Sequence, residues 1–194
     1  MGAFVLTFAV IGLAFTNPGE VASYNVDAAA SQIVWKGYKV LGEHTGTINV
    51  QKCSLNIQDG QLVGGSFAID MTSIACTDLS GEYKGKLEGH LKSDDFFGAA
   101  TYPTATFVIT SATPNGVDRY KVTGNLTIKD ITKEIKFIAN LEKEEGQVVA
   151  KADIQIDRSE FNVRYGSGSF FDSLGDKTIY DEFDLSVSIV ATGN

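Results

Sequence analysis

Histidine and cysteine are the residue types in this chain best suited to bind a metal or move a proton, and there are two of each. His44 and His90 lie far apart in the sequence, and neither has a partner at the short spacing that zinc sites use. We expect His44 in the turn after the strand that contains Trp35, and His90 on the surface or at the end of a helix. The pattern predicts no catalytic residue, no metal ion and no cofactor.

The two cysteines, Cys53 and Cys76, are an even number and could pair in an oxidising compartment. Their separation in the sequence does not show that the two Cα atoms come within disulfide range. We favour two buried or half-buried free thiols and leave the pairing open.

Charged side chains are expected to serve structure and solubility. The 16 basic and 24 acidic residues are scattered and give a net charge of −8, which argues against binding to nucleic acid.

No nucleophile, phosphate-binding or dinucleotide glycine motif occurs, so we expect no enzyme. Six residues are candidates for ion pairs that fix a helical connection to the rest of the fold: Asp70, Asp78, Asp94, Asp95, Arg158 and Arg164.

Most of the chain alternates between apolar and polar residues, which predicts strands with one dry face. The clearest runs are 119–129, 134–142, 148–156 and 179–189, with shorter runs at 67–71 and 105–109. Turns are predicted at Asp59-Gly60, Asn115-Gly116 and Glu145-Gly146, because glycine supplies the positive φ of a tight hairpin. About eight such strands predict an antiparallel sheet that closes into a barrel.

One segment departs from this alternation and is predicted to be a helix. In it, leucine or tyrosine recurs at every fourth position before residue 92, which gives one apolar stripe. These positions are Leu79, Tyr83, Leu87 and Leu91. Asp94 and Asp95 are expected to end the helix, since short carboxylates compete for backbone N–H groups in turns. Pro103 then directs the chain into a strand over 104–111.

Four sequence blocks resemble the YceI-like family of lipocalin-like barrels, also described as polyisoprenoid-binding proteins, over residues 24–190. They are Trp35–Gly37 with Gly42–Gly46; Gly64–Ile74; His90–Phe97 with Tyr102-Pro103 and Thr106-Phe107; and Gly124–Lys129 with Ile156–Phe161. The resemblance implies a secreted, usually periplasmic protein whose barrel holds a long isoprenoid or similar lipid. The fold class expected is all-β, with a short helical connection and an antiparallel lipocalin-like barrel.

The N-terminal residues predict secretion. Residues 3–15 form an uncharged apolar run that is too short to span a membrane and fits the core of a signal peptide. Met1-Gly2 carries no basic residue, so the signal peptide would be truncated at its start; the alternative is a buried strand or helix. We expect a signal peptide over 1–22 and a single barrel domain over 23–194.

The interior of the barrel is expected to hold the ligand. Small residues on the dry face (Ala105, Gly124, Ala139, Ala150 and Ala152) either admit a closely packed neighbour or leave an elongated apolar cavity, and we favour the cavity. Its expected lining is Trp35, Phe67, Ile69, Met71, Leu87, Leu91, Phe97, Phe107, Ile109, Tyr120, Val122, Leu126, Ile128, Phe137, Ala139, Ala150 and Phe183.

The predicted function is an extracytoplasmic protein that binds a long-chain isoprenoid or fatty lipid for transport, storage or an envelope stress response, without covalent chemistry. The alternative is a solid-cored structural or interaction protein of the envelope that binds no ligand. The aromatic loop at 165–171 could cap a barrel mouth, touch a membrane surface or be an ordinary long hairpin, and we favour the hairpin. The choice between monomer and homodimer stays open.

Overall fold

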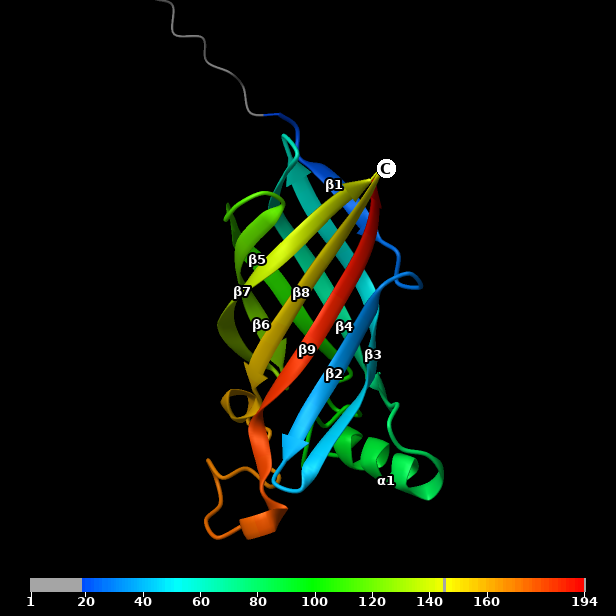
Figure 1. Ribbon diagram of the computed structural model, residues 1–194, viewed down its shortest axis with the longest axis vertical. Helices are drawn as coiled ribbons and strands as arrows, with labels where there is room; N and C mark the ends of the chain where they lie inside the picture. Colours follow the sequence, from blue (N-terminus) through cyan, green and yellow to red (C-terminus); the bar gives the residue numbers. More distant parts are fainter. Residues whose placement is uncertain (1–18, 145, 194) are drawn as a thin grey trace, which may run out of the picture.

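Nine strands and one helix make up the fold in the computed structural model, which describes residues 19–144 and 146–193 (Figure 1). The strands are β1 (Ala22–Val26), β2 (Gln32–Lys39), β3 (Gly42–Gln58), β4 (Gln61–Cys76), β5 (Thr104–Pro114), β6 (Arg119–Ile128), β7 (Ile131–Glu144), β8 (Gln147–Asp157) and β9 (Ile179–Gly193). The helix is α1 (Gly81–Lys92), and two short 3₁₀ helices are η1 (Arg158–Phe161) and η2 (Gly175–Lys177). Residues 1–18, most of the expected signal peptide, lie outside the described part.

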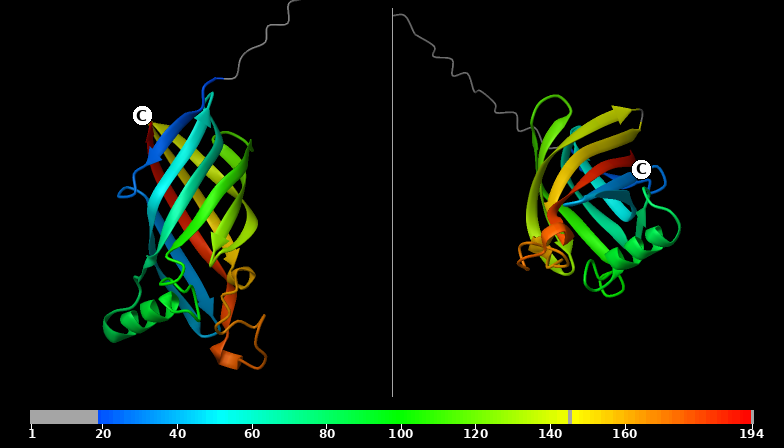
Figure 2. Two further views of the ribbon diagram at one scale, coloured as in Figure 1. Left: turned by 180° about the vertical axis from the view of Figure 1, so that it is seen from behind. Right: turned by 60° about the horizontal axis from the view of Figure 1, so that its bottom comes forward.

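The strands form a closed antiparallel barrel, as the alternation predicted (Figure 2). Each strand from β3 to β8 pairs with the next strand in the sequence, and β2 closes the ring by pairing with both β3 and β9. β1 and β2 occupy the same position in the ring, one after the other along the barrel. β1 pairs with the C-terminal half of β3 and the C-terminal end of β9, whereas β2 pairs with the N-terminal half of β3 and the preceding part of β9. Nine strand segments therefore make an eight-stranded barrel, and the predicted fold class is confirmed.

The sequence analysis predicted the turn between β3 and β4 but missed the turn between β6 and β7. Asp59 and Gly60 have φ of +50° and +75° between β3 and β4, where the sequence predicted a turn. The β6–β7 hairpin uses Lys129 and Asp130 at φ of +49° and +59°, without any glycine. Only a few non-glycine residues adopt this conformation, so no residue type marked this turn in the sequence.

The predicted helix exists, but its apolar stripe is only partly right. Leu79 precedes α1, and Tyr83 is 74% exposed. No residue of α1 is fully buried, because the helix lies against β4 beside one end of the barrel and not inside it (Figure 1). The helix ends at Lys92, where the Ser93 hydroxyl donates to the His90 carbonyl oxygen, so the chain leaves the helix just before Asp94.

The end of the barrel that carries β1 and the C-terminus is solidly packed. Its buried cluster consists of Leu55, Ile57, Leu62, Tyr120, Val122, Ala139, Leu141, Val148 and Ala191. Phe107 packs against it, with ring centroids 6.2 Å from Phe67 and 5.5 Å from Phe137. Gly124 lies directly against the Phe107 ring, while Ala139, Ala150 and Ala152 belong to or pack against this cluster, so these four small residues are placed for close packing between neighbours.

Gly124 offers a direct test of this packing. A Cβ added there would meet the Phe107 ring and lie 2.6 Å from the Val108 carbonyl oxygen. Gly124→Ala should therefore lower the free energy of unfolding by about 1–3 kcal/mol, the usual cost of overpacking a core. Urea unfolding measures it, with Gly37→Ala as the control, since a Cβ at Gly37 meets nothing within 4 Å. Equal effects of the two substitutions would contradict the packed interior.

Candidate functional site

A cavity of about 480 Å³ occupies the other end of the barrel, under α1 and the segment that follows η1. Its walls come from strands β2 to β6, β8 and β9, from α1 and from the connection after it. The apolar lining is Ile33, Trp35, Ile48, Ile69, Met71, Ile74, Leu87, Leu91, Phe96, Phe97, Ala105, Leu126, Ile128, Ile156, Ile179, Phe183 and Leu185. A cavity of this volume and lining suits an apolar molecule.

Nine of the residues predicted for the cavity lie on its wall. They are Trp35, Ile69, Met71, Leu87, Leu91, Phe97, Leu126, Ile128 and Phe183. The structure does not bring the other eight to it, and these pack in the solid end of the barrel: Phe67, Phe107, Ile109, Tyr120, Val122, Phe137, Ala139 and Ala150. Alternation in a strand identifies the face of a residue and not its level along the barrel axis, so the prediction combined both ends.

Residues missed by the sequence analysis are of two kinds. Ile156 and Leu185 follow the same alternation as the predicted residues, and that alternation is the signal that could have found them. The polar wall residues carried no comparable signal. They are Tyr38, Lys39, His44, His90, Arg158, Tyr165, Asp176, Lys177 and Tyr180.

Arg158 fixes the wall of the cavity beside η1 and β9. Its guanidinium donates to the carbonyl oxygens of Val163, Ile179 and Tyr180 at 2.8–3.1 Å, and its side chain is 2% exposed. Burial lowers the Arg158 pKa, while Asp181, whose Oδ1 lies 3.2 Å from Nη2, raises it. The sequence analysis expected Arg158 in an ion pair, but Asp181 was not among the candidate partners.

Aromatic rings join the end of α1 to the loop that follows η1. The His90 ring lies edge-on to Tyr165, with centroids 4.2 Å apart, and 5.7 Å from Phe96. Phe96 contacts Phe97, which in turn contacts Phe183 on β9. His90 is in the last turn of α1, as expected. Tyr165 thus lies on the cavity wall, so the loop at 165–171 is more than a free hairpin.

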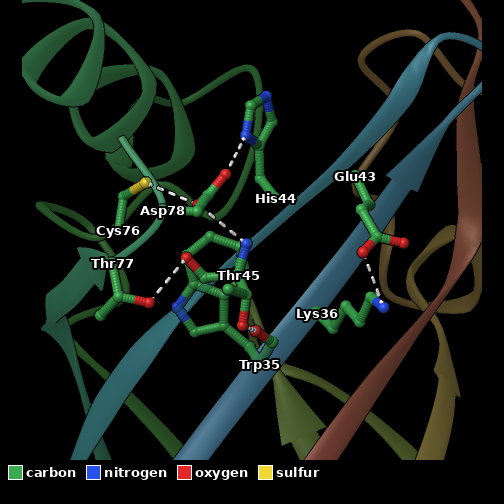
Figure 3. A network of polar contacts seen from close by, with 8 residues as sticks. All are labelled: Trp35, Lys36, Glu43, His44, Thr45, Cys76, Thr77 and Asp78. Atoms are coloured by element: carbon green, nitrogen blue, oxygen red, sulfur yellow. Dashed lines mark hydrogen bonds and ion pairs between the residues drawn. The ribbon is translucent and has the colours of Figure 1, made fainter. Parts of the chain in front are cut away.

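His44 lies in β3 and not in the turn where we expected it, and it belongs to a polar network (Figure 3). Its Nδ1 is 2.8 Å from Oδ2 of Asp78. The other oxygen of Asp78, Oδ1, accepts from the Thr45 backbone N–H at 3.0 Å and faces the Cys76 thiol at 3.1 Å. Burial raises the Asp78 pKa, but the hydrogen bonds from His44, Thr45 and Cys76 outweigh it and lower the pKa to about 2.

This pKa predicts a dependence of stability on pH. A carboxylate with a lowered folded-state pKa stabilises the fold above its unfolded pKa, and the stabilisation disappears as the pH falls through the folded pKa. The Asp78 contribution should amount to about 2 kcal/mol at neutral pH and vanish between about pH 4 and pH 2. Asp78→Asn should therefore be less stable than the wild type at pH 6 and nearly equal to it at pH 2, as measured by urea unfolding. A difference that does not change with pH would contradict the assignment.

Both cysteines are buried free thiols, so the pairing left open by the sequence does not occur in the structure. Within the described ranges, no three His, Cys, Asp or Glu side chains gather in a way that could hold a metal ion. None of the helices described there is long and apolar enough to cross a membrane.

A second hollow, of about 640 Å³, adjoins the cavity at Tyr165 and Lys177. Its lining includes the charged residues Asp94, Asp95, Lys129 and Arg164. Lys129 donates to the carbonyl oxygen of Phe96 at 2.9 Å. Because the lining of this hollow is charged, it does not suit an apolar chain, and we take the mainly apolar cavity as the functional site.

Comparison with protein families gives a match to the YceI-like domain over residues 24–191. Protein YceI of Escherichia coli O157:H7 is 44% identical over 52 residues, which are 27% of either chain. A UPF0312 protein of Azotobacter vinelandii is 40% identical over 50 residues, or 26% of either chain. These matches thus span about a quarter of the relatives' length.

Solved structures extend the likeness over nearly the whole fold. Burkholderia cenocepacia BcnA superposes with a TM-score of 0.70 at 26% identity, covering 86% of this chain and 99% of BcnA. A polyisoprenoid binding domain from Saccharophagus degradans, implicated in plant cell wall breakdown, gives 0.67 at 16% identity over 90% of this chain and all of that domain. At that identity, the second likeness supports the fold alone.

Proposed function

The chain belongs to the YceI-like family, and from this premise we propose that it binds one long-chain apolar molecule, an isoprenoid or a similar lipid, in the cavity under α1. The observation that carries the proposal is an apolar cavity of about 480 Å³ inside a barrel whose other end is solid. The name of the Saccharophagus degradans domain, which binds polyisoprenoids, favours the same ligand class.

The chemistry of the wall supports binding without reaction. Burying apolar surface contributes about 25 cal/mol per Å², so a hydrocarbon chain gains affinity along the cavity without many polar contacts. The buried cation on the wall, Arg158, is already occupied by three carbonyl oxygens and Asp181. The proposed role is therefore a carrier or store of lipid and not an enzyme.

We propose that this role is extracytoplasmic, after removal of residues 1–22 as a signal peptide. Three aromatic residues near the cavity are well exposed: Tyr165, Phe170 and Phe171, at 46%, 38% and 50%. Exposed aromatic rings beside a lipid cavity favour transient contact with a membrane surface during loading.

Native mass spectrometry of the purified protein, followed by lipid extraction, tests the proposal. We expect an added mass that disappears on denaturation and an extracted molecule with a long hydrocarbon chain. If purified protein carries no added mass and takes up no long-chain isoprenoid from mixed micelles, the alternative of a structural protein without a ligand replaces the proposal.

A further inference from the structure

The polar side chains on the cavity wall differ in how many of their hydrogen-bond donors and acceptors already have a partner within the protein. Trp35 donates its indole N–H to the Thr47 carbonyl oxygen at 3.2 Å, and the Tyr38 hydroxyl donates to Asp184 at 2.6 Å. Arg158 is occupied by backbone carbonyls. His44 is held through one ring nitrogen, and Figure 3 shows its other nitrogen directed away from Asp78.

The network decides which ring nitrogen of His44 carries the proton. Asp78 Oδ1 receives the Thr45 N–H and faces the Cys76 thiol, which is fully buried. Burial raises the Cys76 pKa, so its sulfur keeps its proton and donates. Asp78 is then an acceptor at both oxygens, and the group facing Oδ2 must be a donor. In a neutral imidazole, Nδ1 therefore carries the hydrogen and Nε2 carries a free lone pair.

We propose that His44 Nε2 accepts a hydrogen bond from a hydroxyl group at the head of the bound lipid, and that Asp78 positions the ring for it. The inference rests on the proposed function and narrows its ligand class to isoprenoid alcohols or phenols. His44 lines the cavity while keeping its side chain 25% exposed, so it lies where the apolar wall meets solvent. A hydroxyl entering an apolar cavity loses water, and an acceptor placed there restores its hydrogen bond.

A matched pair of probes tests the hydrogen bond, because geranylgeraniol has a hydroxyl head and its methyl ether has none. At about pH 8.5, the wild type should bind the alcohol about tenfold more tightly than the ether. In His44→Phe the preference should fall to near one, while the ether binds as before. His44→Gln, which retains a side-chain acceptor, should regain part of the preference.

Tyr24→Phe is the control, since Tyr24 packs against the buried cluster at the other end of the barrel and this substitution removes a hydroxyl away from the cavity. It should keep the tenfold preference. Equal binding of alcohol and ether by the wild type, or the same loss in His44→Phe and Tyr24→Phe, would overturn the inference and leave lipid binding intact. If the wild type binds neither probe and carries no native lipid, the proposed function itself fails.

The positioning role of Asp78 has a spectroscopic signature. Nitrogen NMR shifts of the His44 ring at the same pH should show a protonated Nδ1 and an unprotonated Nε2 in the wild type. Asp78→Asn should give a mixture of tautomers and a smaller preference for the alcohol. A ring protonated on both nitrogens, or an unchanged tautomer in Asp78→Asn, would overturn the assignment.

Discussion

Replacing Ala105 by phenylalanine is expected to abolish lipid uptake while leaving the protein folded. Ala105 is 5% exposed, lies on β5 and contributes to the cavity wall. A phenyl ring there would enter the empty volume that we assign to the ligand, so the usual penalty for overpacking should be largely avoided. Native mass spectrometry should show the loss of the bound mass, and affinity for geranylgeraniol should fall at least tenfold.

Ala139→Phe is the matched control, because Ala139 is also a strand alanine with 5% exposure. It belongs to the solid cluster at the other end of the barrel. The same ring has no space there and should cost about 1–3 kcal/mol of stability. The fraction that remains folded should still bind lipid. If Ala105→Phe still carries the same lipid, or if it unfolds as Ala139→Phe does, the cavity is not the binding site.

Ala105 and Ala139 also show which features of the structure could be predicted from the sequence. Both lie on the dry face of a strand, and alternation predicted that face correctly. Their opposite surroundings depend on the height of each residue along a barrel whose strands are tilted, which is set by pairing between distant segments such as β3 with β4. Single-strand patterns contain no such information, so fold class was predictable and the division into a solid and a hollow end was not.

The contact between His44 and Asp78 could not be predicted from the sequence, for a different reason. His44 and Asp78 are 34 residues apart and meet because β3 pairs with β4 up to Cys76. The sequence analysis named Asp78 as a candidate for an ion pair, but nothing in the sequence pointed to His44 as its partner, and the dyad exists only in the folded protein. The family resemblance located the block that contains His44, but not its partner.

Arg158→Met is expected to produce the largest loss of stability, about 3–5 kcal/mol, because it leaves the Asp181 carboxylate, which is only 13% exposed, without its cation. Asp181 Oδ1 has no hydrogen-bond donor among the described residues, so the ionic contact at 3.2 Å is its compensation. The substitution also removes the donors to Val163, Ile179 and Tyr180, which hold the start of β9 against the cavity wall. Urea unfolding at neutral pH measures the loss.

A double substitution separates these two causes. Arg158→Met with Asp181→Asn should recover part of the lost stability, since no uncompensated charge remains, and the remainder then belongs to the three carbonyl oxygens. Arg164→Met is the control: this arginine is exposed, stacks on Phe170 and lies in no ion pair of the described residues, so its loss should cost under about 1 kcal/mol. A double variant as unstable as Arg158→Met would show that the backbone contacts, and not the charge pair, carry the stabilisation that Arg158 supplies to the cavity wall.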